Sequence, residues 1–144
     1  MYSFVHLMCM GYIHARTSVY NINYHIVWCT KYRRKVLSPK ISERLYEILE
    51  ETAENNGFEI RECKVGEEDH VYCFVSAPPK LSVTQIVRSM KGVSGQLLLK
   101  EFPEITEKLW KGHLWNSSYF CETIGSTSED NIRRYIERQK TCQH

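Results

Sequence analysis

His70 and Tyr72 stand two residues apart in the strand-like run 69–75, so their side chains are predicted to leave the same face of a sheet. Tyr135 and Gln139 lie near the C-terminus, about one helical turn apart, and share one face of a predicted helix. These four side chains offer an imidazole that can bind metal, two phenols and an amide. The set is sufficient for chemistry on a phosphodiester, with a phenol as the nucleophile and the amide orienting a metal or that phenol.

Each of these residues also has a structural interpretation. A lone histidine on a strand is more often structural than a metal ligand. Tyr135 is adjacent to Ile136 and three residues after Ile132, so it could simply extend the core face of the last helix. Gln139 on the same face argues against plain core packing, because a buried amide needs hydrogen-bond partners. Spacing alone leaves both hypotheses open.

Tyr72 is a poor candidate for a metal ligand on intrinsic grounds. A phenol has a pKa of about 10 and therefore offers a protonated oxygen at neutral pH. Imidazole is the better ligand for first-row metals. The acidic residues that end at Asp69 could bind a cation, but they could equally form an ordinary polar hairpin turn.

Basic side chains are clustered, although the net charge of the chain is only +2. The clusters are Lys31, Arg33, Arg34 and Lys35, and Arg133, Arg134, Arg138 and Lys140. Such clusters are usually solvated surfaces. Aromatic residues beside basic ones suit stacking on single-stranded bases, and they also suit a half-buried strand. The residues of this kind are His25, His113, Trp115 and Tyr119.

Length and composition predict one globular domain, with 144 residues and 42% hydrophobic content. The six cysteines are scattered without a Cys-x-x-Cys pair, which argues against a zinc ribbon or a secreted disulfide scaffold and predicts a cytoplasmic location. We expect residues 1–16 to be an untranslated or disordered extension before a single domain at 17–144. No stretch has the length and character of a membrane span, so no membrane partner is expected.

Hydrophobic periodicity and local signals predict the elements that must position these residues. Gly57 suits the end of the first helix, and Ser82 with Gln85 forms a capping box at the start of the second. Gly92 and Gly95 are expected to interrupt the second helix. The predicted strands are 19–29, 58–65, 70–76 and 114–123, and the predicted helices are 39–56, 82–101 and 128–140. The order predicts an α+β fold with a ferredoxin-like or RRM-like antiparallel βαββαβ sheet and an additional C-terminal helix that carries the tyrosine.

The chain resembles the single-tyrosine HUH transposases of small bacterial and archaeal insertion sequences. Sequence blocks in the same order carry this resemblance from about residue 17 to 140: 24–34, 69–72, 78–80, 90–94, 113–115, 119–120 and 135–139. The resemblance implies cutting and rejoining of single-stranded DNA at hairpin-marked element ends through a 5′-phosphotyrosine. It also implies a homodimer in which the tyrosine helix of one subunit acts in the active site of the other.

Carried onto this sequence, the resemblance makes Tyr135 the nucleophile and His70 and Gln139 ligands of a divalent metal, Mg²⁺ or Mn²⁺. No nucleotide cofactor is implied, because the phosphotyrosine conserves the bond energy. The residues expected to contact DNA are Lys31, Arg33, Arg34, Lys91, Trp115 and Tyr119.

Tyr72 departs from the pattern of this family, which has histidine, a hydrophobic residue and a second histidine. Tyr72 replaces that second histidine. Loss of a metal ligand predicts weakened catalysis, so our hypothesis is that the activity of this copy is impaired. The alternative is a catalytically inactive protein that binds single-stranded or hairpin DNA. A general ferredoxin-like regulatory or RNA-binding domain is disfavoured by the ordered blocks.

Overall fold

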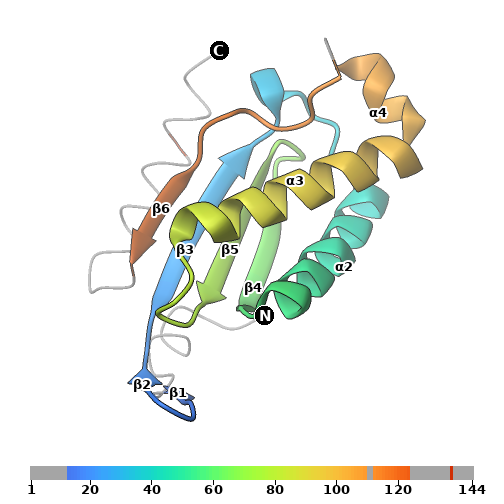
Figure 1. Cartoon of the computed structure of the whole chain (residues 1–144). Helices are drawn as coiled ribbons and strands as arrows, with labels where there is room; N and C mark the ends of the chain where they lie inside the picture. The colour runs from blue at the N-terminus through green and yellow to red at the C-terminus, as the bar shows by residue number, and fades with distance from the viewer. Residues whose placement is uncertain (1–12, 110–111, 124–136, 138–144) are drawn as a thin grey trace.

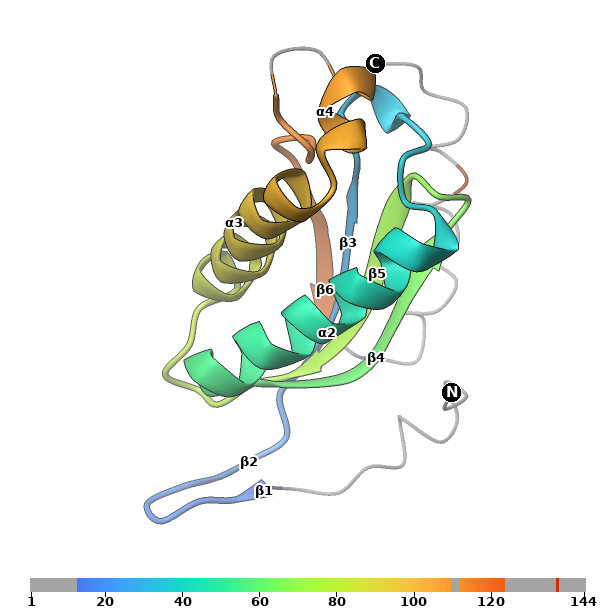
Figure 2. The same cartoon turned by 90° about the vertical axis from the view of Figure 1, so that its right-hand side faces the viewer.

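A four-stranded antiparallel sheet and the two long helices on one of its faces form the body of the protein (Figures 1 and 2). The computed structural model describes residues 13–109, 112–123 and 137. In chain order the elements are β1 (Ile13–His14), β2 (Val19–Tyr20), β3 (Asn23–Cys29), the 3-10 turn η1 (Lys31–Arg33), α2 (Pro39–Asn56), β4 (Glu59–Gly66), β5 (His70–Ser76), α3 (Val83–Glu101), α4 (Pro103–Lys108) and β6 (Phe120–Thr123).

The strand order across the main sheet is β4-β5-β3-β6, with antiparallel pairing throughout. This order places the first and third strands of the βαββαβ unit side by side at the centre, as in a ferredoxin-like sheet. The predicted α+β class is therefore confirmed. The additional helix predicted at 128–140 lies outside the described residues apart from Glu137.

The alternation of side chains along the central strands separates the core from the site. Val71, Cys73 and Val75 of β5 pack into the hydrophobic core with Ile26 and Trp28 of β3. His70, Tyr72 and Phe74 alternate with them and therefore leave the opposite face. All residues of β5 are buried, which makes this strand a rigid base for His70.

The boundaries of α2 follow the local signals. The hydroxyl of Ser38 caps its start by accepting a hydrogen bond from the backbone N–H of Ile41. Gly57 ends the helix with φ at 78°, the left-handed conformation that glycine adopts most easily. The prediction of a helix from Pro39 to the residue before Gly57 is confirmed.

The predicted interruption of α3 is wrong, because the helix runs without a break from Val83 to Glu101. Tertiary contacts outweigh the helix propensity of its glycines: Ser94 is fully buried, and its hydroxyl accepts the indole N–H of Trp115 at 3.0 Å. The predicted capping box of Ser82 and Gln85 is present. Among the described helices, none is both long enough and apolar enough to cross a membrane.

Two of the predicted strands are shorter than expected. The strand predicted at 114–123 forms only at β6, since four residues pair with β3 and Trp115 makes a single bridge to Thr30. The strand predicted at 19–29 divides into β2 and β3, and β2 pairs with β1 instead of the main sheet. Residues 13 and 14, which the sequence placed in the N-terminal extension, therefore form part of a hairpin. α4, which was not predicted, begins at Pro103.

Candidate functional site

His70 is the first residue of β5, and a buried carboxylate fixes its imidazole. The Nδ1 atom lies 2.9 Å from Asp69 Oδ1, and Arg33 Nη2 lies 3.0 and 2.9 Å from the two oxygens of the same carboxylate. An ionised Asp69 accepts a hydrogen bond from Nδ1–H, which makes Nε2 the nitrogen that carries the lone pair. Arg33, Asp69 and His70 thus form a chain that sets both the tautomer and the orientation of the ring.

The loop that supplies Arg33 has a strained backbone. Tyr32 and Arg33 have φ angles of 57° and 53°, in the left-handed region that residues other than glycine rarely adopt. Thr30 holds both ends of this turn: its hydroxyl donates to the carbonyl of Arg34 at 2.8 Å, and its N–H donates to the carbonyl of Asp69 at 2.9 Å. Strain of this kind persists only where the surroundings enforce it, and here it brings the guanidinium to the carboxylate.

Gly66 makes room for the other edge of the His70 ring. The two residues are directly opposed in the pairing of β4 with β5. A Cβ atom at position 66 would lie 2.2 Å from Nε2 and 2.4 Å from Cε1 of His70. Any side chain at this position would therefore displace the imidazole. A glycine at position 66 is required for His70 to keep this orientation.

Tyr72 is hydrogen bonded to a histidine on the neighbouring strand. Its hydroxyl lies 2.8 Å from His25 Nδ1, and the two rings are stacked with centroids 5.6 Å apart. Burial lowers the pKa of His25 to about 4, so this imidazole is neutral at physiological pH. The position of the expected second ligand is thus occupied by the phenol of Tyr72, which is hydrogen bonded to a neutral, buried histidine.

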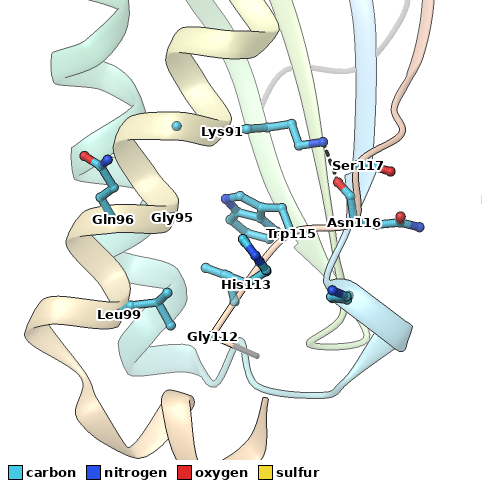
Figure 3. A pocket seen from close by; sticks show the side chains of 12 residues that line it. Lys91, Gly95, Gln96, Leu99, Gly112, His113, Trp115, Asn116 and Ser117 are labelled. Carbon is cyan, nitrogen blue, oxygen red and sulfur yellow. Dashed lines mark hydrogen bonds between the residues drawn. The ribbon is translucent and has the colours of Figure 1, made fainter. Parts of the chain in front are cut away.

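A cavity of about 720 Å³ lies on the helix-covered side, between α3 and the segment 112–117 (Figure 3). None of the described residues that line it is acidic. The cavity is lined by Lys31, Lys91, Gly92, Gly95, Gln96, Leu99, Gly112, His113, Leu114, Trp115, Asn116 and Ser117. It therefore combines positive charge, an aromatic surface and a stretch of helix without bulky side chains, a composition that suits a nucleic-acid strand.

Trp115 and Lys91 fix the shape of this cavity. The indole packs edge-on against Trp28 with centroids 5.8 Å apart, and a Cβ atom at Gly95 would approach it to 3.4 Å. Lys91 Nζ donates to the carbonyls of Asn116 and Ser118 at 2.6 and 3.1 Å (Figure 3 shows the first contact). Burial lowers the pKa of Lys91. The lysine therefore holds the 116–118 backbone against α3.

Thr30 links the two parts of the site. Its N–H donates to the carbonyl of Asp69 at 2.9 Å, and its hydroxyl lies 3.3 Å from the same oxygen. On its other side it forms a β-bridge to Trp115. The hydrogen-bonded group of Arg33, Asp69 and His70 therefore lies at the same end of the sheet as the cavity, on the opposite side of the segment 29–31.

The remaining predicted residues differ in their surroundings. Lys31 borders the cavity and its Nζ lies 5.5 Å from the centroid of the Tyr32 ring. Arg34 and Tyr119 are exposed. The side chain of Arg33 is only 7% exposed and is paired with Asp69, so it is a buried partner of that carboxylate and not the exposed cation that was expected to contact DNA. Tyr135 and Gln139 lie outside the described residues.

The sequence singles out Arg33, Asp69 and His25 but does not predict how they pair. Arg33 and Asp69 are 36 positions apart, and nothing in their local sequence predicts their pairing. His25 faces Phe74 in the register of β3 with β5, which puts Tyr72 on the diagonal. That neighbour could have been inferred only if the register had been known. For Gly66 the sequence indicated only that it begins the turn before His70, and not that it contacts the imidazole.

Comparisons with known proteins match nearly the whole chain. The model of the family described as "Transposase IS200 like" matches residues 18–139. The ISDra2 transposase TnpA of Deinococcus radiodurans is 38% identical over 125 residues, which cover 87% of this chain and 89% of that protein. The transposase for insertion sequence element IS200 of Salmonella typhimurium is 28% identical over 124 residues, covering 84% and 81% of the two chains.

Two solved structures share the fold. A crystal structure of a candidate transposase from Deinococcus radiodurans aligns with a TM-score of 0.80 and 34% identity, over 88% of this chain and 97% of that one. A REP-associated tyrosine transposase bound to a REP hairpin aligns with a TM-score of 0.56 and 15% identity, over 86% of this chain and 68% of that one. At that identity the second likeness concerns the fold alone.

Proposed function

Because this chain belongs to the IS200-like transposase family, we propose that it cuts and rejoins single-stranded DNA at the hairpin-marked ends of an insertion sequence. Tyr135 would attack the scissile phosphate, forming a 5′-phosphotyrosine and releasing a 3′-hydroxyl. That hydroxyl, or another, would later attack the linkage and reseal the strand. In a homodimer, the tyrosine helix of one subunit would act in the site of the other. The observation that carries the proposal is the family match over residues 18–139, which spans the positions of His70 and Tyr135.

The chain of Arg33, Asp69 and His70 supports a role for His70 in this chemistry. A buried Asp–His hydrogen bond of 2.9 Å holds the orientation of the ring. Arg33 pairs with both oxygens of the same carboxylate and so holds Asp69 in place beside the ring. Such an imidazole is suited to hold a cation or to orient a phosphate oxygen.

The described residues fit a divalent metal incompletely. Within the described ranges there is no group of three or more His, Cys, Asp or Glu side chains that could hold a metal ion. His70 offers one nitrogen, whereas Tyr72 offers a phenol that is hydrogen bonded to His25. We propose that His70 and Gln139 would hold Mg²⁺ or Mn²⁺, which would supply charge neutralisation at the phosphate. With one ligand replaced, we expect weak metal binding and impaired activity.

The cavity between α3 and the segment 112–117 supports the proposed contact with DNA. Lys31 places a cation at its border, and Trp115 contributes an aromatic surface. The absence of acidic side chains among its described lining residues favours a polyanion there. Arg34 and Tyr119 lie exposed and would extend the contact. Lys91 would act indirectly, by holding the 116–118 backbone.

A second candidate function is binding of single-stranded or hairpin DNA without cleavage. The hydrogen bond between Tyr72 and His25 favours it, because this bond satisfies a buried phenol at the position of the expected second metal ligand. A site that has lost its metal would keep its fold and its basic, aromatic cavity.

Covalent trapping separates the two candidates. A labelled single-stranded oligonucleotide bearing a hairpin-marked element end is incubated with the protein and Mg²⁺ or Mn²⁺, and adducts are separated under denaturing conditions. A transposase gives an adduct with the natural chain and none with Tyr135→Phe, and Tyr72→His increases the yield. Binding without an adduct in the natural chain supports the second candidate. If Tyr72→His leaves the adduct yield unchanged, the proposed impairment is wrong.

Salt dependence tests the assigned DNA contact. Each phosphate contact to a single strand contributes about 0.7 to the slope of log affinity against log salt concentration. We expect Lys31→Ala to lower that slope by about this amount, while the matched control Lys40→Ala, an exposed lysine on α2, leaves it unchanged. Equal slopes for both variants would show that Lys31 does not contact a DNA phosphate.

A further inference from the structure

Cys63 on β4 and Cys73 on β5 form a pair of thiols outside the site described above. They are directly opposed in the antiparallel register, and their sulfur atoms are 3.3 Å apart. Opposed residues of an antiparallel pair have Cα atoms about 4.5–5.5 Å apart. A disulfide needs about 4.4–6.8 Å between the same atoms. The strands are therefore already at bonding distance, and only the side chains have to rotate.

The two thiols differ in their access to solvent. Cys73 is completely buried in the core, and burial beside Cys63 raises the pKa of its thiol well above the usual value. Cys63 is only partly buried. It also lines a surface cavity of about 170 Å³ together with Tyr46, Glu50, Ile60, Arg61 and Glu62. A small oxidant can thus reach Cys63 from solvent, whereas Cys73 is buried beside Cys63.

We propose that Cys63 and Cys73 form an intramolecular disulfide when the protein meets a hydroperoxide, with Cys63 as the thiol that reacts first. The Cys63 sulfur attacks one peroxide oxygen, the O–O bond breaks, and the thiol proton leaves with the other oxygen as water or an alcohol. The resulting sulfenic acid is then attacked at sulfur by Cys73, the S–O bond breaks, and the hydroxyl leaves with the Cys73 proton as water. Two thiols are oxidised to one disulfide, and one hydroperoxide is reduced.

The bond would close the β4–β5 hairpin three residue pairs away from His70. The pairs between Cys63–Cys73 and Gly66–His70 are Lys64–Tyr72 and Val65–Val71. A covalent link at this place removes local opening of the hairpin whose turn carries Asp69 and His70. Formation of the disulfide does not depend on the proposed DNA chemistry.

Peptide mapping of the full-length protein tests the proposal. The folded protein is treated with excess hydrogen peroxide, remaining thiols are blocked, and the digest is analysed by mass spectrometry without and with reductant. We expect a linked pair of peptides containing Cys63 and Cys73, lighter by two hydrogen atoms and split by dithiothreitol. Amide exchange in the 63–73 hairpin slows in the oxidised sample.

Two variants sharpen the test. Cys63→Ser, at a partly exposed strand position, abolishes the linked peptides and leaves Cys73 as an unmodified thiol. Cys121→Ser, at a partly buried strand position of β6, leaves the linked peptides unchanged. The proposal is overturned if peroxide converts Cys63 of the natural chain to a sulfinic acid, or leaves it unmodified, while Cys73 remains a thiol.

Discussion

The buried ion pair of Arg33 with Asp69 is predicted to couple far more strongly than an exposed pair of the same chemistry. The side chains of these two residues are 7% and 4% exposed, and Arg33 Nε and Nη1 have no hydrogen-bond partner among the described residues. Removing one member of such a pair leaves an uncompensated buried charge, which costs about 3–5 kcal/mol. Asp69→Asn keeps an oxygen for His70 but removes the charge, so we expect the free energy of unfolding to fall by about this amount.

A double-mutant cycle measures the coupling directly. Urea unfolding, followed by tryptophan fluorescence, is compared for the natural chain, Arg33→Met, Asp69→Asn and the double variant. Because the double variant has neither buried charge, we expect it to be more stable than the sum of the single losses predicts, by about 2–3 kcal/mol. The matched control is Arg44 with Glu101, a bidentate pair at 2.7 and 3.0 Å whose side chains are 32% and 35% exposed. Solvent screens that pair, so its coupling should be much smaller. Similar coupling in both cycles would refute the assignment of Arg33 as a buried partner of Asp69.

Three further predictions concern positions with independent physical causes. Gly66→Ala should lower the free energy of unfolding by about 1–3 kcal/mol and shift the NMR signals of the His70 ring, because the new methyl group overlaps the imidazole; unchanged ring signals would contradict this. Burial lowers the pKa of His25 to about 4, so the unfolded chain takes up a proton first as the pH falls from about 6.5 to 4, and the free energy of unfolding should drop by at most about 3 kcal/mol. His25→Gln should remove that loss, and a pH profile identical to that of the natural chain would refute it. Gly92→Ala should raise the free energy of unfolding by about 1 kcal/mol, because α3 is continuous there and a Cβ atom meets no neighbour; a decrease would argue against the continuous helix.

The parts of the fold that could be predicted are those with strong local signals. The alternation along β5, the glycine that ends α2 and the capping box that starts α3 each depend on residues that are close in sequence. The continuity of α3 could not be predicted, because the contact that supports it joins Ser94 to a tryptophan that is 21 residues away. The short length of β6 could likewise not be predicted, because it is set by the number of its residues that pair with β3.

The candidate site was predictable in part for the same reason. Period-two alternation placed His70 and Tyr72 on one face of a strand, where the structure has them. The partners of these residues come from other elements: Asp69 receives Arg33 from a turn 36 residues earlier, and Tyr72 meets His25 across a strand pair. These contacts depend on sheet register and on a strained turn, and neither leaves a local pattern in the sequence.

The pairing of Tyr72 with His25 predicts what a restored histidine at position 72 would do. An imidazole is shorter than a phenol, so Tyr72→His would lose the 2.8 Å hydrogen bond to His25 Nδ1. Loss of a buried hydrogen bond costs about 1–3 kcal/mol, and we expect Tyr72→His to unfold at a lower temperature than the natural chain in the absence of metal. A metal that binds only the folded state then stabilises it in proportion to the logarithm of its concentration above Kd. Mn²⁺ should therefore raise the melting temperature of Tyr72→His more than that of the natural chain. Tyr72→Phe, which loses the same hydrogen bond without gaining a ligand, should respond no more than the natural chain. Equal responses of the three proteins would show that position 72 does not control metal binding. This measurement is independent of strand cleavage, so it separates a missing ligand from a missing catalytic step.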